Sequence, residues 1–239
     1  MASGPMISHT NDDEPTPMTV TDLKPLRRDP ELVELHIDGE LHATIAFAAA
    51  SAERLRVGDV IPAEQLHRLL AVDEHWKAKQ SALSLLAARA RATGELAGRL
   101  RRKGFSGGAI QAALGDIERL GLLDDVAFAE SWVRDRLKLR PRGSEVLVVE
   151  LRRKCIPADI ARAAVARVMT AEDVSDDDLC LAAAERWAAA HAPAAAGPST
   201  RPDESRRLER KLSGFLARRG YRADTIRNAL NAVLRLRPQ

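Results

Sequence analysis

The sequence contains few aromatic residues, since three Trp, one Tyr and four Phe make up 3% of its 239 residues. A hydrophobic core must therefore be built mainly from Leu, Ala, Val and Ile. Because Ala and Leu occur with many Arg and Glu residues, the composition favours helices. The few aromatic residues occur at spacings typical of a core, so we expect no base-stacking platform and no sequence-specific reading of nucleic acid.

Cysteines and long apolar runs are also scarce. Cys155 and Cys180 form no CxxC motif and have no nearby histidine at metal-ligand spacing. This argues against a disulfide framework or a zinc site and fits a reducing cytosol. No apolar run approaches the roughly 20 residues of a membrane helix. The N-terminus lacks the basic flank and apolar core of a signal peptide. We therefore expect a cytoplasmic protein.

The charge is only mildly basic, with a formal net charge of +3 and a pI of about 9.1. Acidic residues outnumber basic ones in the first thirty residues, so the basic character belongs to the rest of the chain. A basic body of this kind fits a nucleic acid or an acidic protein as partner.

The N-terminal part has three patterns. Residues 1–29 are polar and broken by Pro, which predicts a disordered tail. Apolar residues alternate with polar ones on both sides of Asp38-Gly39, which predicts a β-hairpin. A short extended piece at 56–60 leads to Pro62, which suits the first turn of a helix ending near Leu70. We expect a small mixed cap over residues 30–72.

From about residue 73 the pattern becomes helical and repeats three times. Each copy has two leucines four residues apart, then basic residues, then a small residue, an apolar residue and a new helix. The leucine pairs are Leu96/Leu100, Leu147/Leu151 and Leu212/Leu216. Another helical segment precedes each pair, at 77–91, 126–139 and 177–191.

The small residue marks the turn between two helices. Gly104 and Gly220 suit the left-handed conformation that ends many helices, and the basic residues beside them suit the negative end of the helix dipole. Cys155 stands at this position in the second copy, where it weakens the left-handed cap and should change the turn slightly.

We therefore predict a mainly α fold of three tandem three-helix repeats in an elongated, curved array, behind a small N-terminal cap that contains a β-hairpin. The repeats are assigned to residues 73–124, 125–170 and 171–239, with a flexible insertion at about 192–202.

The segment 119–136 (RLGLLDDVAFAESWVRDR), together with the KGF motif at 103–105, resembles the RecX family of recombinase regulators. The pattern of that family is KGF, then a Gly-apolar-apolar-Asp-Asp…Phe-Ala…Trp element, then a second Leu-x-x-Lys-Gly-Ile-like element. The resemblance covers roughly residues 73–236, plus Gly58-Asp59.

The resemblance implies a non-enzymatic protein that acts in DNA repair, homologous recombination and the SOS response. It implies binding in the helical groove of a RecA–DNA filament, with contacts to RecA protomers and to DNA phosphates, and inhibition of strand exchange and ATP hydrolysis. The expected partners are RecA and single- and double-stranded DNA without sequence specificity. The protein is expected to be monomeric.

The basic clusters are the main candidates for these contacts. One cluster alone can be a solvated helix end, but recurrence at the same place in three repeats indicates a positive stripe. The candidate RecA- or DNA-binding residues are Arg99, Arg101, Arg102, Lys103, Arg152, Arg153, Lys154, Arg206, Arg207, Arg210, Lys211, Arg218 and Arg219.

The remaining patterns predict structural roles. Asp124 and Asp125, like the acidic run Asp176 to Asp178, are interpreted as helix caps and not as metal ligands. Trp76, Trp132 and Trp187 are assigned to the core. No catalytic, cofactor-binding or metal site is predicted.

A helix-turn-helix transcription factor is the alternative from another class. It would need base-reading residues where the third helix of each repeat begins. Those starts read Ser-Gly-Gly-Ala, Pro-Ala-Asp and Arg-Ala-Asp, which are typical of caps.

Overall fold

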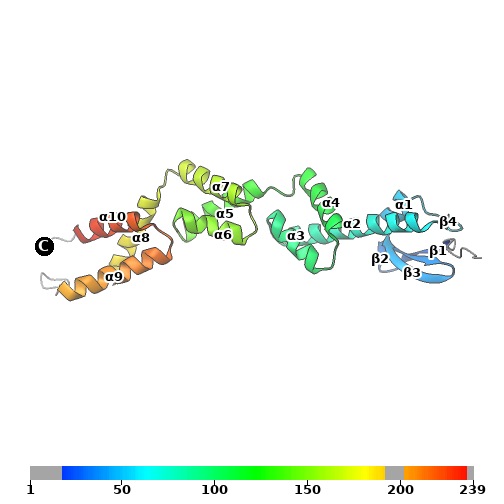
Figure 1. The fold of residues 1–239 in the computed structure, drawn as a ribbon, viewed down its shortest axis with the longest axis horizontal. Coiled ribbons are helices and arrows are strands. Elements are labelled where there is room, and N and C mark those ends of the chain that lie inside the picture. Colours follow the sequence, from blue (N-terminus) through cyan, green and yellow to red (C-terminus); the bar gives the residue numbers. More distant parts are fainter. Residues whose placement is uncertain (1–17, 192–201, 236–239) are drawn as a thin grey trace, which may run out of the picture. The chain divides into compact units, whose positions relative to one another are not determined.

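The computed structural model describes residues 18–191 and 202–235 and is mainly helical, with a small sheet at the N-terminus (Figure 1). The strands are β1 (Met18–Leu26), β2 (Asp29–Ile37), β3 (Glu40–Ala46) and β4 (Val60–Ile61). The helices are α1 (Phe47–Ala52), α2 (Ala63–Ala88), α3 (Thr93–Arg102), α4 (Gly107–Arg119), α5 (Asp125–Leu139), α6 (Ser144–Arg153), α7 (Ala158–Ala171), α8 (Asp176–His191), α9 (Pro202–Arg218) and α10 (Ala223–Arg235).

The four strands form one antiparallel sheet in the order β3-β2-β1-β4. The predicted hairpin is confirmed as β2 and β3, and Asp38 and Gly39 both have positive φ (51° and 88°), as a tight hairpin turn requires. The prediction of a disordered tail over 1–29 is wrong from Met18 onward. There β1 pairs with β2 and buries Val20 completely, and residues 1–17 lie outside the described part of the chain.

The sheet packs on α2, which contributes Leu69 and Trp76 to its core (Figure 1). This helix runs without a break from Ala63 to Ala88, because no Gly or Pro interrupts it. The predicted helix end near Leu70 is therefore wrong, and the predicted boundary between a cap at 30–72 and a repeat at 73–124 falls within this helix. One helix serves both parts.

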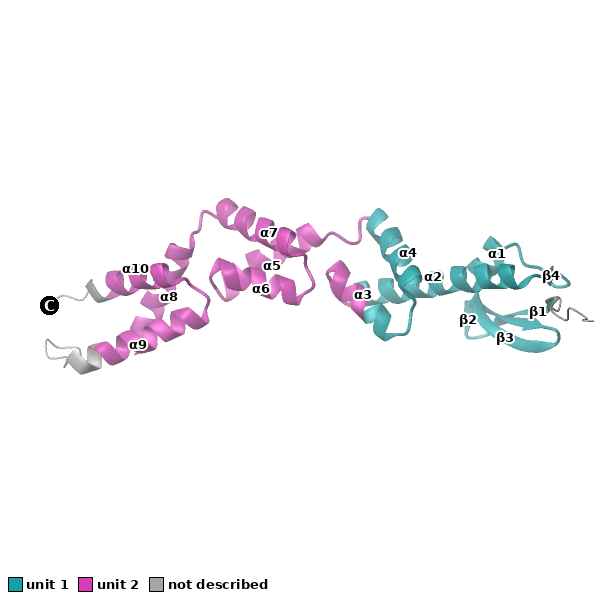
Figure 2. Ribbon diagram, in the orientation of Figure 1, with its two compact units in different colours: residues 1–87, 99–119 teal, residues 88–98, 120–239 magenta. Residues whose placement is uncertain are grey.

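The chain forms two compact units (Figure 2). Unit 1 comprises residues 1–87 and 99–119, and it contains the sheet, most of α2 and all of α4. Unit 2 comprises residues 88–98 and 120–239, with α5 to α10 and the start of α3.

The predicted three-helix repeats are present as α2-α3-α4, α5-α6-α7 and α8-α9-α10. All six leucines of the pairs are at most 3% exposed. The insertion predicted at 192–202 falls almost entirely outside the described residues.

The second and third helices of every repeat are joined by the same left-handed turn. Gly104, Cys155 and Gly220 have φ values of 94°, 66° and 82°. In each turn the following residue donates its backbone N–H to the carbonyl five positions earlier, as Ile156 does to Leu151 at 3.1 Å. Cys155 thus keeps the geometry of the two glycine turns, and the expected change in that turn is not seen.

Neighbouring repeats interlock within unit 2 through helix starts. The carboxylate of Asp125, the first residue of α5, accepts a 2.8 Å hydrogen bond from the N–H of Thr93, the first residue of α3. Asp176, the first residue of α8, accepts one at 2.9 Å from Ser144, the first residue of α6. Both pairs are 32 residues apart. Each repeat therefore caps the second helix of the repeat before it.

Glycine makes a close approach possible beside these caps. Gly143, at the N-cap of α6, donates its N–H to the carbonyl of Arg219 at 3.0 Å. A Cβ at Gly143 would lie 2.8 Å from the carbonyl carbon of Gly220, which belongs to the α9–α10 turn. Gly94 is similarly placed, because a Cβ there would lie 2.8 Å from the carbonyl oxygen of Cys155.

Gly143→Ala is expected to destabilise unit 2 by about 1 to 3 kcal/mol, because backbone atoms must shift to admit the methyl group. Chemical denaturation measures the change. Gly108→Ala is the matched control, since that helical glycine faces open space and alanine there should be neutral or stabilising. Equal stability of Gly143→Ala and the parent chain would contradict the close approach.

Candidate functional site

The candidate binding residues lie mostly at the C-terminal end of the second helix of each repeat, where the left-handed turn begins. Arg101 and Arg102 close α3, Arg152 and Arg153 close α6, and Arg218 closes α9. The last carbonyls of a helix have no partner within the helix and carry the negative end of its dipole. Cations are therefore favoured at these positions whatever else they bind.

The last cation of each cluster folds back onto the protein. Lys103 Nζ donates to Ser81 Oγ at 2.7 Å, and Lys154 Nζ lies 3.8 Å from the centre of the Trp132 ring. Arg219 lies 4.4 Å above the ring of Phe215 and donates to the carbonyl of Pro141. These three residues pack against the protein, whereas the sequence placed them in the outward stripe.

Most of the other cations at these helix ends are exposed to solvent. Arg101, Arg152, Arg153 and Arg218 are exposed, and none has an ion pair or a side-chain hydrogen bond within the described residues. Arg102 is also exposed, whereas Arg99 is half-buried. Each repeat therefore presents at least one exposed arginine at the C-terminal end of its second helix, which suits repeated contacts with phosphates or carboxylates.

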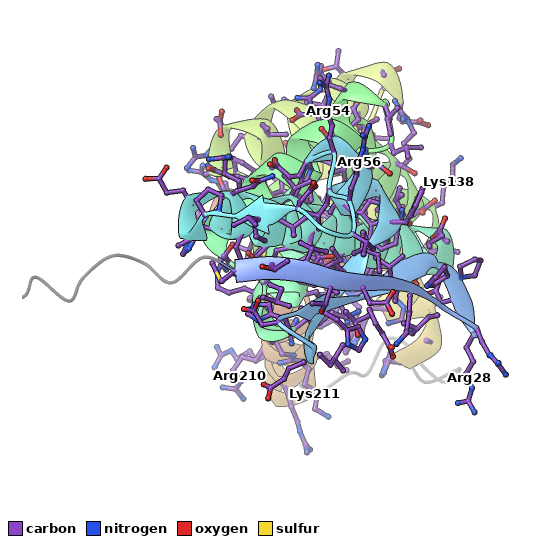
Figure 3. All side chains as sticks on the ribbon, turned by 90° about the vertical axis from the view of Figure 1, so that its right-hand side faces the viewer. Arg28, Arg54, Arg56, Lys138, Arg210 and Lys211 are labelled. Carbon is purple, nitrogen blue, oxygen red and sulfur yellow. The ribbon has the colours of Figure 1, made fainter. Side chains whose placement is uncertain are left out.

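Helix α9 carries a second basic group upstream of its C-terminal end. Arg206, Arg207, Arg210 and Lys211 are exposed, and no carboxylate whose side chain the structure describes pairs with them. Figure 3 shows Arg210 and Lys211 extending away from the ribbon. The alignment of all clusters into one stripe remains a prediction.

The acidic residues have structural roles, as predicted. Asp124 Oδ1 accepts 2.9 Å hydrogen bonds from the N–H groups of Val126 and Ala127 and so caps α5. Asp178 accepts from Ser175, and these hydrogen bonds hold the pKa of its carboxyl below the ordinary value. Among the described residues, no group of three or more His, Cys, Asp or Glu is placed to hold a metal ion. Sequence reasoning missed that Asp125 and Asp176 cap the preceding repeat, although the shared 32-residue spacing to Thr or Ser was a usable signal.

Two groups that could act as nucleophiles are buried. Burial raises the pKa of the Cys180 thiol to about 11 and the pKa of the Tyr221 hydroxyl to about 12. Both groups are therefore almost fully protonated near neutral pH, and each packs in the core of the third repeat. The three tryptophans are half-buried and pack against cores, as predicted.

Sequence reasoning also missed a cleft of about 300 Å³ in unit 2, between the α5–α6 loop and the helices α8 and α9. Its lining includes the arginines Arg140, Arg186 and Arg219 and the aromatic residues Trp187 and Phe215. These residues come together only when the second and third repeats pack, so no local sequence pattern predicts the cleft.

Comparison with known proteins identifies the family. Three domain models of that family match, described as the first, second and third three-helix domains of RecX, at residues 78–116, 124–165 and 197–230. A regulatory protein RecX from Prosthecochloris aestuarii is 34% identical over 158 residues, which cover 66% of this chain and 94% of that protein. The chain belongs to the RecX family.

Other members agree with this assignment. A RecX protein from Amycolatopsis mediterranei is 36% identical over 62% of this chain and 78% of its own length. The crystal structure of a regulatory protein RecX superimposes with a TM-score of 0.64 over 87% of this chain and 96% of that chain, at 18% identity. The crystal structure of RecX from Lactobacillus salivarius superimposes with a TM-score of 0.55 over 68% of this chain and 97% of that chain, at 22% identity. At these identities the two structures support the fold.

The RecX relatives are named as regulatory proteins and not as enzymes or transcription factors. The helix-turn-helix transcription factor is therefore not favoured. In the part of the chain that the structure describes, no helix combines the length and the apolar character needed to cross a membrane.

Proposed function

We propose that this RecX-family chain binds RecA filaments on DNA, without sequence specificity, and inhibits the RecA ATPase and strand exchange. It acts as a monomer in the cytoplasm, during DNA repair and the SOS response. Its contacts are the exposed arginines of the repeats and the basic face of α9, which meet acidic groups of RecA and DNA phosphates.

The observation that carries the proposal is the recurrence of exposed arginines at the same helix end in all three repeats, in a chain of this family. A filament offers the same surface again at each protomer. Weak contacts from several repeats then add through effective concentration, so that useful affinity needs no single large interface.

The test is the ATPase rate of RecA on single-stranded DNA while the chain is titrated in from well below one molecule per RecA. We expect inhibition at sub-stoichiometric ratios, because one bound molecule affects a filament and not a single subunit. An unchanged ATPase rate, with binding of the chain to free DNA intact, would leave only a DNA-binding repeat protein.

The third helices provide a check on the transcription-factor alternative. Ser106 begins the first of them as a cap, since its Oγ lies 3.3 Å from the N–H of Ala109 and its own N–H donates to Glu74. Tight binding to one DNA sequence at high salt would restore that alternative.

A further inference from the structure

The cleft between the second and third repeats has a strongly cationic lining. Arg140, Arg186 and Arg219 line it together with His191, and none of the described residues that line it carries a carboxylate. Arg186 donates to the carbonyl of Ala182 on its own helix, and Arg219 to the carbonyl of Pro141. Within the described residues none of the three arginines forms an ion pair, so their charge is available to an anion.

Aromatic faces form the wall beside these cations. The rings of Trp187 and His191 are stacked, with centroids 4.4 Å apart and planes within 8° of each other. The ring of Phe215 lies 6.3 Å from Trp187 at 40°. Flat aromatic faces next to arginines are the combination with which proteins hold single-stranded nucleic acid, because bases stack and phosphates bind the guanidinium groups.

The second repeat shows how different this arrangement is. There Trp132 has Arg136 at 4.2 Å and Lys154 at 3.8 Å from its ring centre, so cations of its own repeat cover the ring. In the third repeat His191 and Phe215 contact Trp187 instead, a cation lies over the neighbouring ring, with Arg219 4.4 Å from the centre of Phe215, and the arginines line a cleft. The aromatic cluster is thus combined with an anion-binding lining.

The cleft walls are fixed by bonds across the two repeats. The N–H of Gly143 donates to the carbonyl of Arg219 at 3.0 Å, and the Arg219 guanidinium donates back to Pro141 at 3.2 Å. A preformed site loses little conformational freedom on binding. Its volume of about 300 Å³ is at the small end of ligand sites, which suits a single nucleotide.

We propose that this cleft holds one nucleotide of a single DNA strand, with the phosphate on Arg140 and Arg186 and the base on the wall formed by Trp187, His191 and Phe215. The inference rests on the DNA contact of the proposed function and gives it a specific place. An acidic peptide would satisfy the arginines but leave the aromatic wall without a planar partner.

The test measures binding of the full chain to a fluorescein-labelled oligo(dT) strand and to an abasic strand of equal length, by fluorescence anisotropy. Both strands offer the same phosphates, so the ratio of their affinities isolates the base. We expect oligo(dT) to bind at least about 5-fold more tightly. His191→Ala and Trp187→Leu should reduce this ratio towards one, and Arg140→Ala/Arg186→Ala should weaken both strands.

The matched control is Arg152→Ala/Arg153→Ala, which should weaken both strands and preserve the ratio. His191 is exposed at the end of α8, so its variant tests the wall even if Trp187→Leu fails to fold. Equal affinity of the parent chain for both strands overturns the nucleotide site and leaves the DNA contact standing. If the parent chain binds neither strand, both the nucleotide site and the DNA contact of the proposed function are overturned.

A labelled peptide of Asp and Glu tests the other occupant. Binding of this peptide that depends on Arg140 and Arg186, together with an oligo(dT)-to-abasic ratio of one, would assign the cleft to an acidic protein segment and overturn the proposal.

Discussion

Reversing Arg152 and Arg153 to glutamate is expected to weaken binding to a RecA filament on DNA about tenfold or more. The same change should lower the slope of the affinity against salt by about two, since each lost phosphate contact removes roughly one released counterion. The structure limits the substitution to this pair, because Lys154 lies over Trp132 and its loss would also disturb packing. Binding is measured over a series of salt concentrations, with the ATPase assay in parallel.

A matched control keeps the total charge change equal. Arg162→Glu/Arg227→Glu reverses two exposed arginines on the third helices α7 and α10, away from the basic helix ends. We expect a much smaller loss of affinity and of ATPase inhibition. If the control loses as much as the Arg152/Arg153 variant, then only net charge matters, and the helix ends are not the contact surface.

Replacing Asp73 by alanine is expected to destabilise unit 1 by about 3 to 5 kcal/mol, a large fraction of the roughly 5 to 15 kcal/mol by which a domain is ordinarily stable. Asp73 is 6% exposed and accepts a 2.7 Å hydrogen bond from the N–H of Ala46, at the end of β3. Its other oxygen lies 2.7 Å from Lys77 Nζ, which also donates to the carbonyl of Thr44. Alanine would leave a half-buried ammonium and a buried N–H without their carboxylate partner. Urea denaturation of the full chain measures the loss.

Asp22→Ala serves as the control for this substitution. Asp22 pairs with Lys24 at 3.1 Å, but both side chains are more than 40% exposed, and such surface pairs contribute about 0 to 1 kcal/mol. Asp73→Asn should fall between the two, because an amide oxygen can still accept from Ala46. A loss below 1 kcal/mol for Asp73→Ala would show that the sheet does not depend on this tie to α2.

The helical repeats were predictable because residues close together in the sequence determine each helix and turn, and the same pattern occurs three times. The leucine spacing, the small residue of the turn and the basic helix end lie within ten residues of one another, and a single copy would have been ambiguous. Strand β1 shows the opposite case. Pro25 and the charged residues Asp22 and Lys24 give it the composition of a loop, and two register shifts interrupt its pairing with β2. Its partners, and not its own residues, make it a strand.

The candidate site divides in the same way. The positions of the basic clusters follow from the repeat, but the orientations of Lys103 and Lys154 depend on the first helix of their repeats. Lys103 reaches Ser81 and Lys154 reaches Trp132 over the same 22-residue spacing, so an alignment of first helices with turns would have separated them from the stripe. The cleft could not be predicted from the sequence, because it forms only when two repeats pack together. Its residues Arg140, Trp187 and Phe215 come from the α5–α6 loop, α8 and α9, which are far apart in the chain.

The caps between repeats also affect how the chain can be divided. Helix α3 receives its cap from Asp125 and α6 receives its cap from Asp176, so the first and second repeats are each completed by a residue that is synthesised after them. A fragment that ends after the first or second repeat would lose the carboxylate that accepts a hydrogen bond from the first N–H of its middle helix. The repeats are therefore not exchangeable modules, and a fragment that keeps its last repeat intact must extend into the first turn of the next one.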